Sequence, residues 1–178
     1  MSERRIALLR GINLGATNRV AMPELRALME DLGYDDVATL VQSGNVVFTS
    51  GAAPSTLERR LEQAIEERLG VAAKVVVRTR DELAAAIDAN PFEVPDDPKN
   101  LHVTFLGGEP DAEAAAELED AELGGDRVAF RGREVYVAYK AGMGRSELAK
   151  RLGRAKLGVT ATDRNWNTVT KLLEMADG

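Results

Sequence analysis

The sequence predicts an α+β fold, with a ferredoxin-like βαββαβ plait followed by a second, smaller βαββ-αα subdomain. Between Arg5 and Arg78, short β-rich runs alternate with amphipathic helical periodicity in the order β-α-β-β-α-β, which is the order of that plait. A proline-rich stretch from Pro91 to Pro98 then interrupts regular structure, and a second β-α-β-β run follows it. We therefore expect a plait with its linking helix over residues 1–90 and a second α/β subdomain with C-terminal helices over residues 91–178.

Local patterns predict the elements of the first subdomain. One helix begins near Pro23, whose fixed φ suits a first helical position, and ends before Gly33. Another opens with the capping-box residues Ser55 and Glu58 and ends before Gly70. Runs rich in β-branched residues predict four strands, which are Arg5–Leu9, Val37–Val41, Val46–Thr49 and Lys74–Arg78.

The second subdomain repeats only part of that order. Thr79 and Glu82 form a further capping box, which opens an alanine-rich helix that ends at Asn90-Pro91. The patterns after the linker predict a strand at Leu101–Leu106, a helix at Asp111–Leu123, strands at Arg127–Phe130 and Glu134–Tyr139, and helices at Ser146–Leu152 and Arg164–Met175. The chain is thus expected to end in helices instead of a final strand.

Composition excludes several classes of protein. A chain of 178 residues with 44% hydrophobic and 29% charged residues is typical of a soluble globular protein. No apolar run approaches the length of about 20 residues that spans a bilayer, and the N-terminal apolar stretch is too short for a signal peptide, so we expect a cytoplasmic protein without a membrane partner. The absence of Cys and the presence of one His, His102, exclude disulfides, thiolate ligands and His-pair metal sites, and we expect no metal and no cofactor.

Charge is distributed unevenly along the chain. The net charge is −6, but residues 81–122 carry 1 basic and 13 acidic side chains, whereas residues 127–171 carry 11 basic and 3 acidic ones. An excess of that size favours a polyanionic partner such as a nucleotide or nucleic acid. It is also the pattern expected if the basic third docks near the acidic third, and the sequence leaves both interpretations open.

The loop after the first strand is the first candidate binding region, and its polar residues are Arg10, Asn13, Asn18 and Arg19. Arg presents a planar fork suited to phosphate or carboxylate, and the glycines of this loop let backbone N–H groups approach an anion. The loop matches neither a Walker loop nor a dinucleotide-binding fingerprint. The alternative is that Asn13 and Asn18 bond their own backbone and hold a long turn.

The turn between the second and third strands is the second candidate. A tight turn requires only Gly44 and Asn45, so Gln42 and Ser43 are left for a ligand to explain. Gln42, Ser43 and Asn45 are therefore candidate ligand contacts. Since the first and third strands of a plait lie side by side, this turn is expected near one edge of the domain.

A polar string near the C-terminus is the third candidate, and it contains Arg164, Asn165, Trp166, Asn167 and Thr168. Helical spacing of Trp166 with Val169, Leu173 and Ala176 predicts that the Trp packs inward from a helix capped by Thr162 or Asp163. One interpretation is a capped amphipathic helix with its Trp between the subdomains. Another is an anion site formed by the helix N-terminal amides and Arg164. In a third, this string touches the first loop.

Three strings, Leu8–Val20, Gln42–Phe48 and Thr162–Leu173, together resemble the hallmarks of the DUF1697 family, a domain of unknown function. The resemblance extends over essentially the whole chain and implies two small α/β subdomains in tandem. It implies no activity. It makes the matching residues candidates without assigned roles; they are Arg10, Gly11, Asn13, Gly15, Gln42, Ser43, Gly44, Asn45, Arg164, Asn165, Trp166 and Thr168.

Three functional hypotheses follow. The first is a binding protein in which Arg10, Arg19 and Arg164 hold an anionic ligand, a nucleotide or nucleic-acid phosphate, between the subdomains. The second is an enzyme acting on a phosphorylated or carboxylated metabolite through Arg and Asn electrostatics, with unknown catalytic residues. The third is a structural or protein-partner module without a small ligand. An aromatic content of 4% offers few stacking platforms, and we interpret His102, in an alternating strand, as a sheet residue instead of a catalyst.

Overall fold

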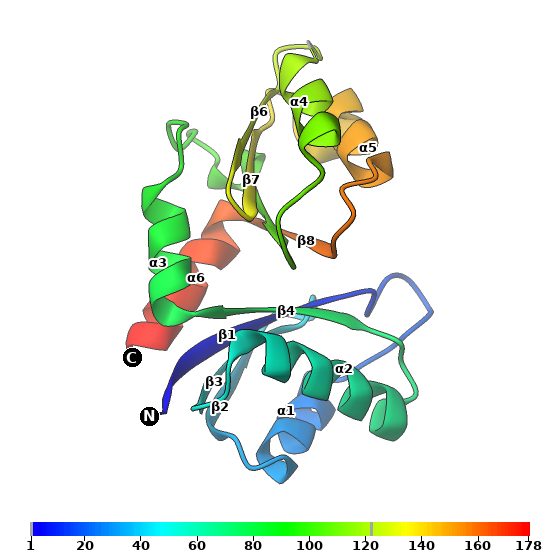
Figure 1. The fold of residues 1–178 in the computed structure, drawn as a ribbon, viewed down its shortest axis with the longest axis vertical. Coiled ribbons are helices and arrows are strands. Elements are labelled where there is room, and N and C mark those ends of the chain that lie inside the picture. Colours follow the sequence, from blue (N-terminus) through cyan, green and yellow to red (C-terminus); the bar gives the residue numbers. More distant parts are fainter. Residues whose placement is uncertain (1, 122) are drawn as a thin grey trace. The chain divides into compact units, whose positions relative to one another are not determined.

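The computed structural model describes residues 2–121 and 123–178, which form a mixed α+β fold with two four-stranded antiparallel sheets and six α-helices (Figure 1). The chain divides into two compact units. The N-terminal unit comprises Met1–Ala85 and Lys171–Gly178, and the C-terminal unit comprises Ala86–Thr170. The two boundaries fall within helices α3 (Arg80–Asp88) and α6 (Trp166–Asp177).

The N-terminal unit has the β-α-β-β-α-β order that the sequence predicts. Its elements are β1 (Glu3–Arg10), α1 (Met22–Asp31), β2 (Asp35–Leu40), β3 (Asn45–Ser50), α2 (Pro54–Leu69) and β4 (Lys74–Thr79). The strand order β2-β3-β1-β4 places β1 and β3 side by side in the middle of the sheet, as expected. Figure 1 shows α1 and α2 together on one face of this sheet.

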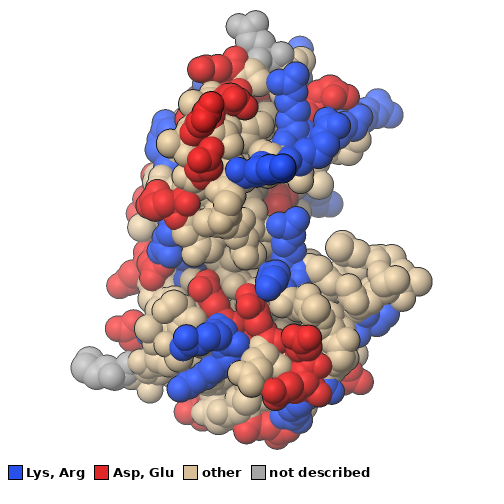
Figure 2. Space-filling view, turned by 45° about the vertical axis from the view of Figure 1, so that its right-hand side comes forward, with Lys and Arg blue, Asp and Glu red and all other residues tan. Residues whose placement is uncertain are grey.

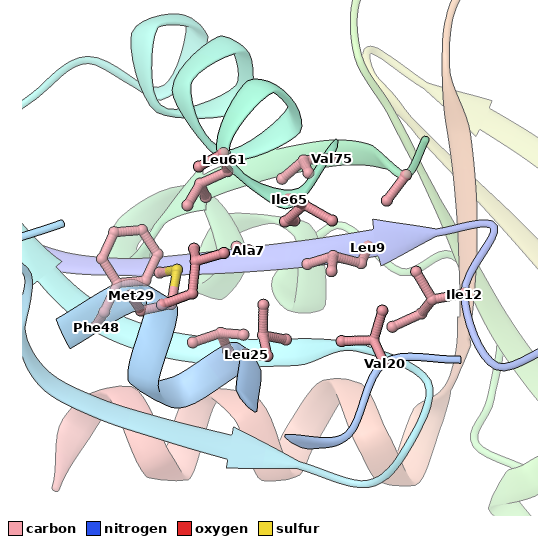
Figure 3. Packing of buried hydrophobic residues seen from close by; sticks show 14 of the residues in the cluster. Ala7, Leu9, Ile12, Val20, Leu25, Met29, Phe48, Leu61, Ile65 and Val75 are labelled. Atoms are coloured by element: carbon pink, nitrogen blue, oxygen red, sulfur yellow. The ribbon is translucent and has the colours of Figure 1, made fainter. Parts of the chain in front are cut away.

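The core of the N-terminal unit lies between that face and its two helices. Alternate residues of the strands point toward the helices, among them Ala7 and Leu9 of β1 and Phe48 of β3 (Figure 3). Leu25 and Leu61 meet them from α1 and α2 and are no more than 1% exposed. Burial of one such large side chain contributes about 1.5–3 kcal/mol, so this face supplies much of the unit's stability.

Helix α2 begins differently from the prediction. Its N-cap is Ala53, which makes no side-chain cap, and the predicted capping box of Ser55 and Glu58 is wrong. The Glu58 carboxylate instead accepts a hydrogen bond of 2.9 Å from the backbone N–H of Val77 in β4. The cap predicted at Thr79 is present, since Thr79 Oγ1 accepts from the N–H of Glu82 at 3.0 Å.

The C-terminal unit contains a final strand that the sequence analysis missed. Its elements after α3 are η1 (Pro98–Asn100), β5 (Leu101–Leu106), α4 (Ala112–Asp120), β6 (Arg127–Arg131), β7 (Glu134–Ala138), η2 (Met143–Arg145), α5 (Glu147–Arg154) and β8 (Ala161–Asn165). The sheet order is β6-β7-β5-β8. The predicted βαββ-αα ending is therefore wrong, because β8 pairs with β5 along its whole length, from Leu106↔Ala161 to His102↔Asn165.

The extra strand also moves the start of the last helix. Helix α6 begins at Trp166 instead of Arg164, and its N-terminal cap is Asn165, whose Oδ1 accepts from the N–H of Thr168 at 3.1 Å. The predicted caps, Thr162 and Asp163, lie inside β8. The buried face of α6 carries Trp166, Val169, Leu172 and Ala176, so Leu172 takes the place predicted for Leu173.

The two sheets correspond residue by residue. Backbone N–H groups of Leu9 and Leu106 donate to the equivalent turns, at Gly44 and Arg133, over 2.8 and 2.9 Å. In the last strands, Arg78 pairs with Ile6, and Arg164 pairs with Val103. Both last strands run directly into a helix. Strand β1 therefore corresponds to β5, and β4 to β8.

Candidate functional site

The first predicted cluster is organised by Asn13. Its Nδ2 donates to the carbonyl oxygens of Val20 at 2.9 Å and Gln42 at 2.7 Å, and its Oδ1 accepts from the N–H of Val20 at 2.8 Å. These bonds tie the loop after β1 to the β2–β3 turn and use both ends of the amide. The loop and the turn thus lie together at one end of the sheet, and Asn13 holds them there.

The other predicted residues of this loop are exposed. Arg10 is the last residue of β1, and Arg19 lies near the end of the loop. Asn18 adopts φ 53° and Asn13 φ 52°, a left-handed conformation that Asn tolerates better than most residues. The expectation that these two Asn residues shape a long turn agrees with this geometry.

The β2–β3 turn is held by Asn45. This side chain is fully buried, and its Nδ2 donates to the Leu40 carbonyl oxygen at 2.9 Å and to Ser43 Oγ at 3.0 Å. Gly44 has φ 85°, and a Cβ placed there would lie 2.7 Å from the Cβ of Leu9. Of the candidates in this turn, Ser43 and Asn45 have structural bonds, and Gln42 contributes its backbone carbonyl to Asn13.

The third predicted cluster lies in the C-terminal unit, at the junction of β8 and α6. Arg164 is 7% exposed, and its Nη1 donates to Thr162 Oγ1 and to the Asp163 carbonyl oxygen, each at 2.7 Å. Burial lowers the pKa of Arg164 to about 10, against the opposing effect of the Asp163 charge. Asn165 and Thr168 form the helix cap, Trp166 is buried, and Asn167 is exposed.

A different surface of the C-terminal unit concentrates exposed cations. Residues 140–156 contain six basic side chains and a single acidic one, Glu147. The basic side chains, which we call the cationic segment, are all exposed and are Lys140, Arg145, Lys150, Arg151, Arg154 and Lys156. Figure 2 shows Lys and Arg side chains gathered in the upper part of the view, with acidic side chains beside them.

Most of the cationic segment has no carboxylate partner. Among the residues that the structure describes, only Lys150 of this set forms an ion pair, with Glu147 at 3.1 Å. The Arg154 Nε donates to the Lys150 carbonyl oxygen at 3.3 Å, a bond that leaves its charge uncompensated. Exposed cations without carboxylate partners are available to phosphate groups.

The loop at the start of the cationic segment is anchored by Asp126. Its two carboxylate oxygens accept from the N–H of Lys140 at 2.7 Å and from Ser146 Oγ at 2.6 Å, and Ser146 Oγ also accepts from the N–H of Ala149 as the cap of α5. A cavity of about 260 Å³ lies against this loop, and its lining holds two cations, Lys140 and Arg145, and two carboxylates, Asp126 and Glu147. These bonds fix the backbone at Lys140 and next to Arg145.

A second hollow, of about 450 Å³, lies between α4 and α5. Its lining carries charges of both signs, which are Asp111, Glu113, Glu117, Arg151, Arg154 and Lys156. The three carboxylates oppose an anion inside the hollow, so the hollow itself is not a candidate anion site. Over residues 2–121 and 123–178, no group of three or more acidic or His side chains is placed to hold a metal ion.

The cationic segment was not among the candidate sites predicted from the sequence. Its charge excess was visible in residues 127–171, but the strings singled out were those with unusual amides and glycines. The signal that identifies the segment is the number of basic residues on and beside α5, in which Leu148 is buried while Arg151 and Arg154 are exposed. In the described part of the chain, no helix has the length and apolar character needed to cross a membrane.

Comparisons with known proteins agree with the fold. A family model described as "Protein of unknown function (DUF1697)" matches residues 2–136. A solved structure of the conserved bacterial protein SP0830 from Streptococcus pneumoniae is similar over 99% of both chains, with a TM-score of 0.82 and 24% sequence identity. An unknown protein from Galdieria sulphuraria aligns with 93% of this chain and 99% of its own at 14% identity, but its TM-score of 0.28 supports no argument. No protein with a curated description matches the chain.

Proposed function

This chain belongs to the DUF1697 family, and because that family's description assigns no activity, we propose from the geometry that the protein binds the phosphate groups of nucleic acid through the cationic segment of its C-terminal unit. One observation carries the proposal: five exposed cations of residues 140–156 have no carboxylate partner among the described residues. The proposal moves the predicted anion site away from Arg164, whose guanidinium is buried.

The arrangement of the cations supports an extended ligand more than a compact one. Lys140 and Arg145 flank the loop cavity, whereas Arg151 and Arg154 lie along the second half of α5. A helix rises about 1.5 Å per residue, so Arg151 and Arg154 lie only about 4.5 Å apart along the axis, and contact with more than one phosphate requires the loop cations as well. Since the net charge of −6 opposes nonspecific attraction over the whole protein, binding depends on this local segment.

We also infer that each unit is a ferredoxin-like plait, since both have the β-α-β-β-α-β order and matching strand orders. The inference supports the binding proposal in one respect. The loop carrying Lys140 and Arg145 follows the third strand of the second plait, where the first plait has only the short connection between β3 and α2. The additional loop is therefore specific to the C-terminal unit.

Fluorescence anisotropy with a labelled single-stranded oligonucleotide tests the proposal. The double variant R151E/R154E should weaken binding by at least about tenfold, and R59E/R60E, with the same charge change on exposed residues of α2, should change it by less than about twofold. The logarithm of the wild-type binding constant should fall with the logarithm of salt concentration with a slope of about −2 to −4, since each phosphate contact on a single strand contributes about −0.7.

Three results would contradict the proposal. Absence of binding at low salt would favour a structural or protein-partner module. Equal losses in the two double variants would mean that net charge, not the segment, attracts the ligand. Binding of free nucleotides with a slope no steeper than about −1 would favour the alternative of an enzyme acting on a phosphorylated metabolite in the loop cavity.

A further inference from the structure

His102, the one histidine of the chain, belongs to a polar cluster on the helix-covered face of the C-terminal sheet. Its Nδ1 lies 2.5 Å from Oδ2 of Asp163, and Oδ1 of the same carboxylate accepts a hydrogen bond of 2.9 Å from Thr104 Oγ1. The ring of Tyr139 meets the imidazole edge to face, with 5.0 Å between ring centroids. Asp163 thus accepts from two side chains of the neighbouring strand β5.

The N-terminal unit has apolar residues at two of the three positions of this cluster and the buried Arg5 at the position equivalent to His102. The positions equivalent to Thr104 and Asp163, which pair with each other, are occupied there by Ala7 and Val77, which also pair with each other. Both apolar residues are fully buried. Since burial of polar groups costs free energy unless they are hydrogen-bonded, an apolar pair is the simpler solution for packing alone. The cluster is a departure from that solution.

The imidazole has one nitrogen available for chemistry. A carboxylate only accepts hydrogen bonds, so the contact with Asp163 places a hydrogen on Nδ1, and in the neutral imidazole this leaves the lone pair on Nε2. Nε2 has no hydrogen-bond partner among residues 2–121 and 123–178, and it is not one of the side-chain atoms that are sealed from solvent without a partner. An oriented imidazole with a free, solvent-reachable nitrogen is the arrangement of a general base.

Tyr139 connects this cluster to the loop of the cationic segment. It directly precedes Lys140, and its N–H donates to the carbonyl oxygen of Asn100 at 2.8 Å. Burial raises the pKa of its phenol, and the charges of Asp163 and of Asp126, which lines the loop cavity, raise it further. Tyr139 is therefore in ring contact with His102 and directly adjacent in the chain to Lys140, and its phenol stays protonated at neutral pH.

We propose that His102 is the general base of a catalytic site that cleaves RNA held on the cationic segment. The Nε2 lone pair takes the proton of a ribose 2′-hydroxyl, whose oxygen then attacks the adjacent phosphorus. The bond from phosphorus to the 5′-oxygen breaks, and that oxygen takes a proton from water. The products are a 2′,3′-cyclic phosphate and a 5′-hydroxyl, and His102 returns its proton to solvent.

Each residue of the cluster has a separate role in this reaction. His102 is the catalytic residue, because its Nε2 contacts the reacting hydroxyl. Asp163 is a positioning residue, which holds the imidazole in one tautomer, and Thr104 holds Asp163. Lys140 and Arg145 supply positive charge beside the phosphate. DNA lacks the attacking hydroxyl, so the site acts on RNA alone.

The inference rests on the proposed nucleic-acid binding, and the experiment separates the two. Binding is measured by anisotropy with fully 2′-O-methylated RNA, which cannot be cleaved by this route. Cleavage is measured with unmodified RNA and with DNA of the same sequence, and the ends of the products are identified by mass spectrometry. We expect cleavage of RNA only, with cyclic phosphate ends.

The His102→Asn variant is the central comparison, because its amide can donate to Asp163 in place of Nδ1 while Nε2 is lost. We expect cleavage to fall by at least about 100-fold with binding of methylated RNA unchanged within about twofold. The identically purified variant also controls for contaminating nuclease. His102→Ala, together with the thermal unfolding midpoint of both variants, shows whether a loss reflects unfolding.

Asp163→Asn tests whether Asp163 holds the imidazole of His102 in one tautomer, which a residue that only packs against the ring would not do. Because the chain has one histidine, its imidazole ¹⁵N resonances are assigned without ambiguity. The wild-type spectrum should show Nδ1 protonated and Nε2 bare, and the variant should show mixed tautomers with cleavage reduced about tenfold or more.

If methylated RNA binds but unmodified RNA stays intact, the catalytic inference is overturned and the binding function stands. Equal cleavage by wild type and His102→Asn also overturns it, and absence of binding overturns both proposals.

Discussion

The N-terminal and C-terminal units share their element order, strand order and pairing register, but they differ in what the helix-covered face of each sheet contains. In the first unit the paired residues Ala7 and Val77 belong to the apolar core, and the position equivalent to His102 is the buried Arg5. In the second unit the equivalent pair is Thr104 and Asp163, and His102 joins it. The comparison teaches that an apolar pair is sufficient for the strand register at these two positions, so the register itself does not require the hydrogen-bonded pair of Thr104 and Asp163.

The largest effect is expected when the N-terminal unit receives one member of the cluster without its partners. Val77→Asp places a carboxylate among fully buried apolar side chains, and an uncompensated buried charge costs about 3–5 kcal/mol. The free energy of unfolding, from urea titration followed by circular dichroism, should fall by that amount.

The reverse exchange is the matched control for this prediction. Asp163→Val in the C-terminal unit removes an acceptor from His102 and Thr104 and should cost about 1–3 kcal/mol, because two side chains lose a partner but no charge is buried alone. A loss from Val77→Asp no greater than the loss from Asp163→Val would mean that the two faces are not the different environments described here.

The hairpin turns provide a second, intermediate contrast. A Cβ on Gly44 would meet the Cβ of Leu9 at 2.7 Å and Cδ1 of Ile12 at 2.8 Å, and the residue has φ 85°, so Gly44→Ala should cost about 2–4 kcal/mol. Gly132 of the β6–β7 turn has φ 59° with no atom within 4 Å of a Cβ, so Gly132→Ala should cost only about 1–2 kcal/mol. Urea unfolding of both variants measures the difference, and equal costs would show that Leu9 and Ile12 move aside freely.

The smallest effect concerns alkaline stability, which the C-terminal unit should limit. Burial, followed by the charges of Asp163 and Asp126, raises the pKa of Tyr139 above its usual 10.0. The unfolded chain therefore loses the phenolic proton first, and the stability that is present below pH 10.0 declines as the pH rises above it.

Tyr139→Phe removes this titration. Above pH 10.0, the decline in the free energy of unfolding should become shallower by up to about 1.4 kcal/mol per pH unit. Urea titrations between pH 8 and pH 11 measure this slope. An unchanged slope would show that Tyr139 ionises in the folded state, which the structure contradicts.

Much of the N-terminal unit could be predicted because its local signals agree with its tertiary structure. Pro23 opens the first helix region, Gly70 closes α2 with φ 70°, and the β-branched runs of β3 and β4 become strands. The exception was Glu58, whose capping-box spacing fits a local bond although the carboxylate bonds a distant strand. Sequence spacing cannot reveal a competing partner on another element.

The C-terminal unit was predicted less well because tertiary partners override local preference in β8. Asp163 and Asn165 are disfavoured in strands, and the apolar spacing after Trp166 favoured an early helix start. The bonds that accommodate Asp163 come from His102 and Thr104, about sixty residues earlier. Because β8 was not predicted, the cluster could not be predicted either, since only the β5–β8 register brings His102 and Asp163 together. The roles predicted for Arg10, Gln42 and the other loop residues stay predictions.

The two glutamates of α2 that bond to β4 bear on how this protein avoids aggregation. Strand β4 lies at the edge of its sheet and carries three consecutive valines, a sequence that would readily recruit a strand from another molecule. Glu58 and Glu62 occupy the N–H groups of Val77 and Val75, so an incoming strand must first displace two carboxylates. Replacing both glutamates would leave the hydrophobic core intact but expose the N–H groups of the β4 edge strand, and we expect such a variant to form fibres.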